Sequence, residues 1–302
     1  MVKVDAGGGD RLALAVLAQY RMATTEQLHL LIAPGVRIEQ TRRRMAKLRV
    51  EGLVDRVTLA QAGRTRVWFV TEYGAQVAAQ LPELRDWQAP RLASDRTAVR
   101  LKAGHGLTVT EVGLAFVQDA RRRGEVCRPL DWIPEVYHPL GNGEAVIPDG
   151  LLYYRTSPAD SREEWSMLRA FVEVDRATMG PERLAAKIGA YARLHRYVPV
   201  PVPVGRPRQP FMEPPEEPWR RRYPVFPRLL FILDNTGLAG IQNRAQALRA
   251  AGRDTALAGF LRTVPVLVAA MADLLRDGPA APVWRPVQDL SQHVSWTQTR
   301  NA

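Results

Sequence analysis

Three carboxylates lie at a spacing that could support metal-dependent chemistry. Asp149 follows the first of two apolar runs, and Glu173 and Asp175 lie within the second. Because side chains alternate along a strand, Glu173 and Asp175 share one face of that run. Isolated carboxylates in an apolar strand are costly, and hard divalent cations usually compensate them. We therefore expect Asp149, Glu173 and Asp175 to bind Mg²⁺ (or Mn²⁺), an ion that stabilises the charge developing at a cleaved phosphodiester.

A lysine follows these acids in a segment that the sequence predicts to be a helix. Lys187 lies twelve residues after Asp175 and four before Tyr191. From the next helix its ammonium could reach back to the strand acids. There it could neutralise a transition-state phosphate or orient the attacking water. The competing interpretation is an ordinary solvent-exposed helix lysine.

Each acid also has a structural interpretation without chemistry. Asp149 precedes Gly150, and Pro-Asp-Gly is a common turn sequence. The two acids of the second run could lie on an exposed edge strand or pair with Arg176 and Arg183. A turn alone does not explain two acids inside an apolar strand, so we retain all four residues as candidate catalytic groups.

Composition favours a polyanionic partner. The 302 residues suffice for two modest domains that each bury a core. There are 42 lysines and arginines against 31 aspartates and glutamates, which gives a net charge of +11 and a pI near 10.3. This excess favours nucleic acid over a membrane as the partner. A GC-rich genome would explain arginine in place of lysine, but not the excess over acids.

Several other classes are excluded. The single cysteine, Cys127, rules out an internal disulfide or a multi-cysteine zinc site and favours a reducing cytoplasm. No apolar run approaches the roughly 20 residues of a membrane span. Residues 1–10 hold three consecutive glycines and lack the apolar core of a signal peptide. No phosphate-binding Gly-x-x-x-x-Gly-Lys-Ser/Thr loop occurs. We expect a cytoplasmic protein.

The first hundred residues carry the pattern of a winged helix-turn-helix. Apolar spacing predicts helices at 11–20, 25–32 and 37–51. Thr24 and Gln27 supply a capping box for the second helix, and Gly52 ends the third. Two strands at 53–59 and 65–71 with a glycine-bearing loop predict the hairpin wing, and a short helix at 73–81 follows.

The third helix is the expected DNA-reading element. In a winged helix it enters the major groove while the wing flanks the backbone. Basic density is highest there, and the candidate DNA-binding residues on the helix and wing are Gln40, Arg42, Arg43, Arg44, Lys47, Arg64 and Arg66. The alternative is the solvated face of a winged helix that binds protein.

A second domain with a central mixed sheet follows. Its elements are expected at 106–123 (helix), 126–136, 144–154 and 169–176 (strands), 181–196 (helix), 228–233 (strand), 238–251 (helix) and 263–269 (strand). The expected organisation is a winged helix at 1–81, a linker at 82–104, this α/β (α+β) domain at 105–290 with an exposed proline-rich insertion at 199–227, and a polar tail at 291–302.

The order of acids and elements resembles the PD-(D/E)XK restriction-endonuclease-like superfamily, whose motif is an Asp on one strand and Glu-x-Lys on the next. Asp175 stands where that motif has its lysine. Some members carry the lysine on a neighbouring helix, so the resemblance assigns that role to Lys187. The chain is more similar to the actinobacterial replication-relaxation family, which has a winged helix, a segment like 171–178, and a Lys-x-x-x-Tyr helix. That resemblance implies a role in plasmid or mobile-element replication or transfer.

Two functions remain open. The first is a Mg²⁺-dependent endonuclease or nickase that the winged helix positions on double-stranded DNA. The second is a catalytically inactive DNA-binding accessory or regulatory protein, whose second domain would serve homodimer formation or recognition of DNA shape. Asp175 in place of the motif lysine favours the second. A third possibility, an adaptor that binds only protein, is disfavoured by the net charge of +11.

Overall fold

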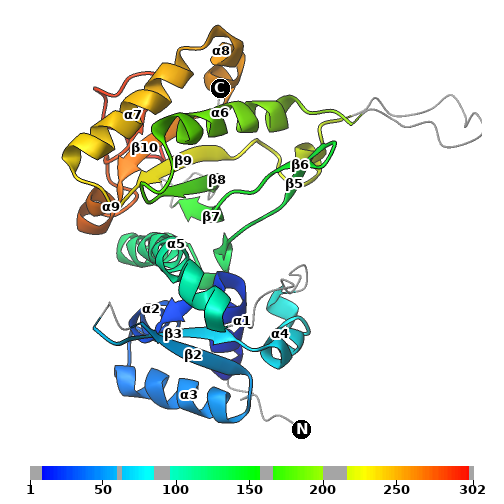
Figure 1. The fold of residues 1–302 in the computed structure, drawn as a ribbon, viewed down its shortest axis with the longest axis vertical. Coiled ribbons are helices and arrows are strands. Elements are labelled where there is room, and N and C mark those ends of the chain that lie inside the picture. The colour runs from blue at the N-terminus through cyan, green and yellow to red at the C-terminus, as the bar shows by residue number, and fades with distance from the viewer. Residues whose placement is uncertain (1–8, 60–62, 85–95, 157–165, 200–215, 299–302) are drawn as a thin grey trace, which may run out of the picture. The chain divides into compact units, whose positions relative to one another are not determined.

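The computed structural model describes residues 9–59, 63–84, 96–156, 166–199 and 216–298 (Figure 1). The chain forms two compact units. One comprises Met1–Pro134 with Leu152–Met167, and the other Glu135–Leu151 with Leu168–Ala302. The expected fold class is confirmed: the chain is α/β, with a winged helix at its N-terminal end and a mixed sheet after it. No described helix has the length and apolar character needed to cross a membrane.

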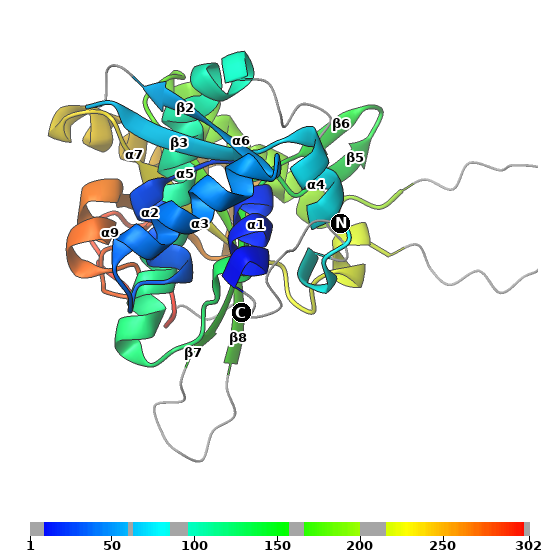
Figure 2. The ribbon, with the colours of Figure 1, turned by 90° about the horizontal axis from the view of Figure 1, so that it is seen from below.

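The winged helix has the predicted order of elements. They are α1 (Gly9–Tyr20), β1 (Ala23–Thr24), α2 (Thr25–Ile32), α3 (Ile38–Val50), β2 (Val54–Leu59), β3 (Thr65–Val70) and α4 (Glu72–Ala78). The strands form an antiparallel sheet in the order β1-β3-β2. Figure 2 shows α2 and α3 side by side with α1 next to them. The two-residue strand β1 was not predicted.

Local sequence signals explain where these helices begin and end. The Thr24 side chain accepts from the Gln27 N–H at 3.0 Å, and the Gln27 side chain accepts from the Thr24 N–H at 3.0 Å, which forms the predicted capping box. Gly52 follows α3 at φ +74°, a left-handed conformation that favours glycine. At Gly74 a side chain would meet the Leu53 carbonyl oxygen, because an added Cβ would lie 1.8 Å from it.

The boundary between the compact units differs from the expected linker at 82–104. Helix α5 (Arg96–Arg123) begins ten residues before the helix expected at 106–123 and belongs to the first unit. Its Val99 and Ala103 join Met22 and Phe69 in one buried apolar cluster. Residues 82–84 form a 3₁₀ turn, η1 (Pro82–Leu84), and 85–95 lie outside the described residues. Pro82, Pro90 and several charges predict a linker, but Val99 and Ala103 place the end of that segment in the apolar core.

The second unit is built on a largely parallel sheet. It contains, side by side, β11 (Arg285–Pro286), β10 (Val266–Ala270), β9 (Arg228–Leu233), β8 (Ser166–Asp175) and the beginning of β7 (Gly150–Thr156). Strands β8, β9 and β10 are parallel, and β11 is antiparallel to β10, which confirms the mixed sheet. Every residue of β9 is buried, as in a strand that is covered on both faces.

Helices and 3₁₀ turns complete the second unit. They are α6 (Pro181–Arg196), α7 (Leu238–Gly252), α8 (Ala258–Thr263), α9 (Met271–Asp277) and the 3₁₀ turns η3 (Pro218–Arg221) and η4 (Thr255–Leu257). Helices α6 and α7 pack against each other (Figure 1). The sequence predicts a strand at 169–176, a helix, a strand at 228–233 and a second helix, in that order. The structure confirms this order as β8, α6, β9 and α7.

Two of the expected strands are interrupted. The strand expected at 126–136 is reduced to β4 (Trp132–Ile133) after the 3₁₀ turn η2 (Pro129–Asp131). The strand expected at 144–154 is divided into β6 (Glu144–Val146), which pairs with β5 (His138–Gly141), and β7. Prolines at 129, 134 and 148 fall at these breaks, and proline has no N–H to donate to a strand ladder.

The described parts of the proline-rich insertion, which was expected to be exposed, and of the expected polar tail carry buried aromatic residues. Residues 200–215 of the proline-rich stretch lie outside the described residues, but the rest of it buries Trp219, Tyr223 and Phe226. Trp219 stacks on His195 at 5.6 Å between ring centroids. In the expected polar tail, Trp296 is fully buried. Aromatic residues within polar or proline-rich sequence thus anchor both segments.

Candidate functional site

Glu173 is the centre of the candidate site. Its side chain lies on β8 and is only 2% exposed. Lys187 donates a hydrogen bond from Nζ to Oε2, and Tyr191 donates from its hydroxyl to Oε1 at 2.6 Å. Both partners come from α6, where residues four apart lie on one face. The expected approach of Lys187 to the strand acids is therefore observed, and it places Tyr191 against Glu173 as well.

Asp149 joins the same cluster from the segment before β7. Its Oδ2 accepts a hydrogen bond from the Val174 N–H at 2.7 Å, between the two strand acids. Its charge acts on both Glu173 and Lys187. Three of the four expected residues, Asp149, Glu173 and Lys187, are thus brought together.

Asp175 is held by a different partner. Its Oδ2 accepts from Nε of Arg244 at 2.6 Å, and its Oδ1 accepts from the Ala177 N–H at 3.1 Å. Arg244 also donates to the Met179 carbonyl at 2.6 Å. Both side chains of this ion pair are at least nine-tenths buried. The sequence analysis missed Arg244, because no local pattern separates it from the other arginines of α7.

Burial controls the electrostatics of Glu173. Loss of water raises the pKa of its carboxyl to about 7, and the Asp149 charge adds to the rise while Lys187 and Tyr191 oppose it. The Lys187 side chain is 31% exposed and loses less water. Burial lowers its pKa, but the carboxylates of Glu173 and Asp149 outweigh that effect and raise it above the ordinary value. Lys187 therefore remains charged near neutral pH.

Protein groups surround the acids of the expected metal site. Within the described parts of the chain, no group of three or more His, Cys, Asp or Glu side chains is placed to hold a metal ion. Both oxygens of Glu173 accept hydrogen bonds, and the Arg244 guanidinium lies beside Asp175. Protein cations thus compensate the strand acids in this arrangement, and a Mg²⁺ or Mn²⁺ site formed by Asp149, Glu173 and Asp175 stays a prediction.

The expected DNA-reading helix divides into two sets. Gln40, Arg42 and Arg43 are exposed on α3. Arg44 and Lys47 instead pair with Asp10, at 3.0 and 2.6 Å. Because Asp10 is only 4% exposed, its two cations are attached to the body of the winged helix. Gln40, Arg42 and Arg43 present their polar groups to solvent and are not paired with Asp10.

Arginines also gather on the wing. Arg64, at φ +62°, and Arg66 are exposed. The Arg56 guanidinium lies over the Trp68 ring, 5.4 Å from its centroid. Burial lowers the pKa of Arg56, and the charges of Arg66 and Arg49 lower it further. The β2–β3 hairpin therefore carries a cluster of positive charge next to its tip.

This winged helix, followed by a mixed sheet that carries buried acids and a helix lysine, defines a two-part protein with one candidate nucleic-acid interface. The sequence matches the replication-relaxation family over residues 14–201, more than half of the chain. The protein belongs to the replication-relaxation family, and its function is DNA-related.

Solved structures add a weak likeness. A mutant of ZitR from Lactococcus lactis aligns with 14% identity over 40% of this chain and 77% of that one, with a TM-score of 0.24. A second ZitR mutant, in apo form, aligns with 15% identity over 37% and 71%, with a TM-score of 0.21. Likeness at this level carries no functional conclusion. No protein of curated function matches the sequence.

Proposed function

We propose that the protein binds double-stranded DNA through α3 and the wing and acts as an accessory or regulatory factor in replication. The observation that carries the proposal is the exposed set Gln40, Arg42 and Arg43 on the third helix of a winged helix. In this fold that helix enters the major groove. The exposed wing arginines and the net charge of +11 favour the same partner.

The buried acids then have a structural role in the second unit. Asp175 is neutralised by Arg244, and Glu173 is bound by Lys187 and Tyr191. These interactions join β8 to α6 and α7 without a metal ion. The second unit would serve homodimer formation or recognition of DNA shape, and light scattering of the free and DNA-bound protein tests the first of these.

The test of DNA binding compares two matched double variants. Arg42→Ala with Arg43→Ala removes two exposed charges from α3, and Arg100→Ala with Lys102→Ala removes two exposed charges from α5. We expect the α3 variant to weaken duplex binding and to lower the salt slope by about 0.9 for each phosphate that the protein no longer neutralises. The measurement is fluorescence anisotropy with labelled duplex across a salt series.

The control decides how the result is interpreted. If both double variants weaken binding equally, net charge and not α3 carries the interaction. If the α3 variant binds like the parent at every salt concentration, the winged helix is not the DNA-reading element and the proposal fails.

A second candidate function is metal-dependent DNA cleavage, as an endonuclease or nickase in plasmid or mobile-element replication or transfer. The grouping of Asp149, Glu173 and Lys187 favours it, because an Asp, a Glu and a lysine are the residue types of the PD-(D/E)XK site. The Arg244–Asp175 ion pair and the absence of a three-ligand cluster among the described residues argue against it.

Cleavage of supercoiled DNA distinguishes the two candidates. The parent, Glu173→Gln and the exposed control Glu182→Gln are incubated with Mg²⁺ or Mn²⁺, and with EDTA. Under our proposal the parent leaves the DNA intact in every condition. Nicking by the parent and by Glu182→Gln that disappears with EDTA and with Glu173→Gln would establish the nuclease instead.

A further inference from the structure

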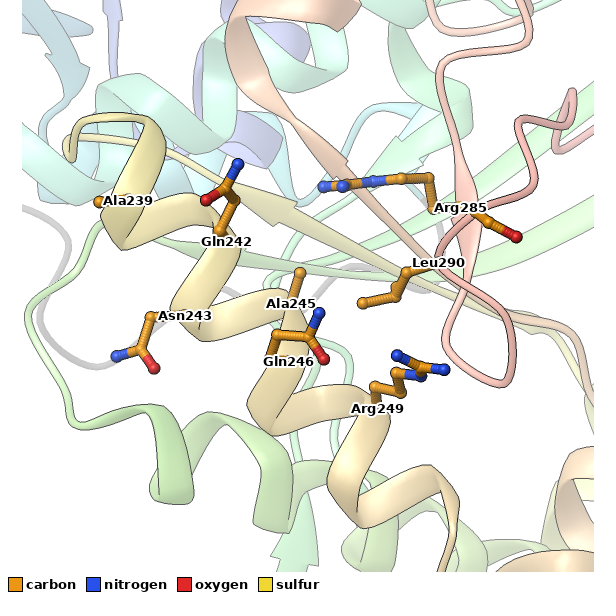
Figure 3. A pocket seen from close by; sticks show the side chains of 9 residues that line it. Ala239, Gln242, Asn243, Ala245, Gln246, Arg249, Arg285 and Leu290 are labelled. Atoms are coloured by element: carbon orange, nitrogen blue, oxygen red, sulfur yellow. The ribbon is translucent and has the colours of Figure 1, made fainter.

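A polar groove lies along α7, in the second unit. Its volume is about 580 Å³, and none of its lining residues belongs to the Glu173 cluster. One wall carries Gln242, Gln246 and Arg249, at the i, i+4 and i+7 positions of one helix face. The other wall carries Arg285 from β11 and Ser291 from the loop after it (Figure 3).

The groove has a positive and polar lining. Figure 3 shows Arg285 extending towards α7 near Gln242, and Arg249 at the other end of the groove. No acidic side chain is among the residues that line it within the described chain. The nearby acid is Asp289, which acts on Arg249, but its oxygens already accept hydrogen bonds from Ser291 and Gln292. The groove therefore favours an anionic ligand.

One hydrogen-bond donor of Arg249 has no acceptor among the described residues. This donor is the Nε group, which is buried. A buried donor without an acceptor is costly and rare in folded proteins. An anion that entered the groove beside the guanidinium could supply the missing acceptor.

We propose that this groove binds a nucleotide, with Arg249 holding its phosphate at one end, and Arg285 and the carboxamides of Gln242 and Gln246 contacting its base. The guanidinium fork matches the oxygen geometry of a phosphate. A carboxamide offers a donor and an acceptor together, which suits the edge of a base. The volume falls within the roughly 300–1,000 Å³ of small-ligand sites. The nucleotide is either a unit of single-stranded DNA, a source that rests on the DNA-binding function proposed above, or a free mononucleotide.

Two charge-matched double variants test the groove. Arg249→Met with Arg285→Met removes its guanidinium groups, and Arg253→Met with Arg262→Met removes two exposed arginines outside its lining. The probes are a labelled single-stranded oligodeoxynucleotide, deoxyadenosine monophosphate and the labelled duplex. We expect the groove variant to bind the single strand or the mononucleotide at least about tenfold more weakly, because it can no longer form charge-assisted hydrogen bonds. The control should bind like the parent.

The same probes separate the two sources and the two proposals. Loss of single-strand binding alone assigns a unit of a DNA strand, and loss of mononucleotide binding assigns a free nucleotide. If the parent binds no DNA but the groove variant loses mononucleotide binding, the groove stands although the proposed function fails. Equal binding by parent and groove variant, equal losses in both variants, or no nucleotide binding by the parent would overturn the inference. Binding of an acidic peptide in place of every nucleotide probe would also overturn it.

Discussion

The guanidinium of Arg244 on α7 and the carboxylate of Asp175 on β8 form a buried ion pair, with 2.6 Å between Nε and Oδ2. The two residues lie 69 positions apart in the chain. Their interaction fastens a covering helix to the end of a central strand and compensates an acid that would otherwise be isolated in the sheet.

Removing the cation should destabilise the fold. Arg244→Met leaves Asp175 buried without its partner, and we expect the free energy of unfolding to fall by about 3–5 kcal/mol. Asp175→Asn in the Arg244→Met background removes the uncompensated charge and should restore part of the loss. Chemical denaturation of the parent, both single variants and the double variant measures the coupling. Additive losses would show that the pair is not a unit.

Stability should depend on the protonation of Glu173. Burial raises the pKa of Glu173 to about 7 in the folded protein, whereas an unfolded glutamate titrates near about 4.3. The folded state therefore binds more protons than the unfolded state between these values. The contribution of Glu173 to the free energy of unfolding is full below about pH 4.3 and is lost as the pH rises through about 7. Lys187 titrates above this window, because the pKa of Lys187 is raised from an already high value.

The measurement is the free energy of unfolding at pH values from 5 to 8. Glu173→Gln should flatten the decline, since it removes the titrating group. An exposed control variant, Glu182→Gln, should show the same decline in stability as the parent. A decline that survives in Glu173→Gln would place the responsible group elsewhere.

Tyr191 should tune this titration. Its hydroxyl donates to Glu173 at 2.6 Å and thereby lowers the pKa of that carboxyl. Tyr191→Phe removes the donor, so the pKa of Glu173 should rise further and the pH-dependent loss should shift to higher pH. Carboxyl-carbon NMR of labelled glutamate measures the pKa of Glu173 directly. An unchanged midpoint would contradict the hydrogen bond.

Pairing with Asp10 should distinguish the cations of α3 that stabilise the fold from those that contact DNA. Arg44→Ala with Lys47→Ala leaves the buried Asp10 carboxylate without these two partners and should cost about 1–3 kcal/mol of stability. Arg43→Ala, at an exposed position, should change stability by less than about 0.5 kcal/mol. Thermal melts without DNA make the comparison, and equal destabilisation by both would refute the distinction.

The helix cap at Thr24 should be worth a measurable amount. Thr24→Ala removes the side-chain acceptor for the Gln27 N–H and should lower stability by about 0.5–2 kcal/mol. Thr24→Ser keeps the hydroxyl and should retain most of the stability that the cap contributes. If the serine variant is as unstable as the alanine variant, packing of the threonine methyl and not the cap is responsible.

Much of the winged helix could be predicted, because its signals are local. The apolar period of α1, the Thr24–Gln27 capping box and Gly52 at a positive φ each act within a few residues of one another. The same holds for the approach of Lys187 to Glu173, since strand alternation and helix spacing over fourteen residues limit where the two side chains can lie. These features depend on backbone geometry that the residue types themselves impose.

Only the tertiary structure decided what the acids do and where the units divide. Arg244 and Arg249 look alike in sequence, but one is buried against Asp175 and the other lines a groove. Asp10 holds Arg44 and Lys47 from another helix, 34 and 37 residues away. Such pairings join elements that are distant in the chain, and their energy depends on burial, which arises only when the elements pack. That is why the sequence alone predicts a metal ion for these carboxylates, and only the folded chain shows which arginine and lysine lie beside them.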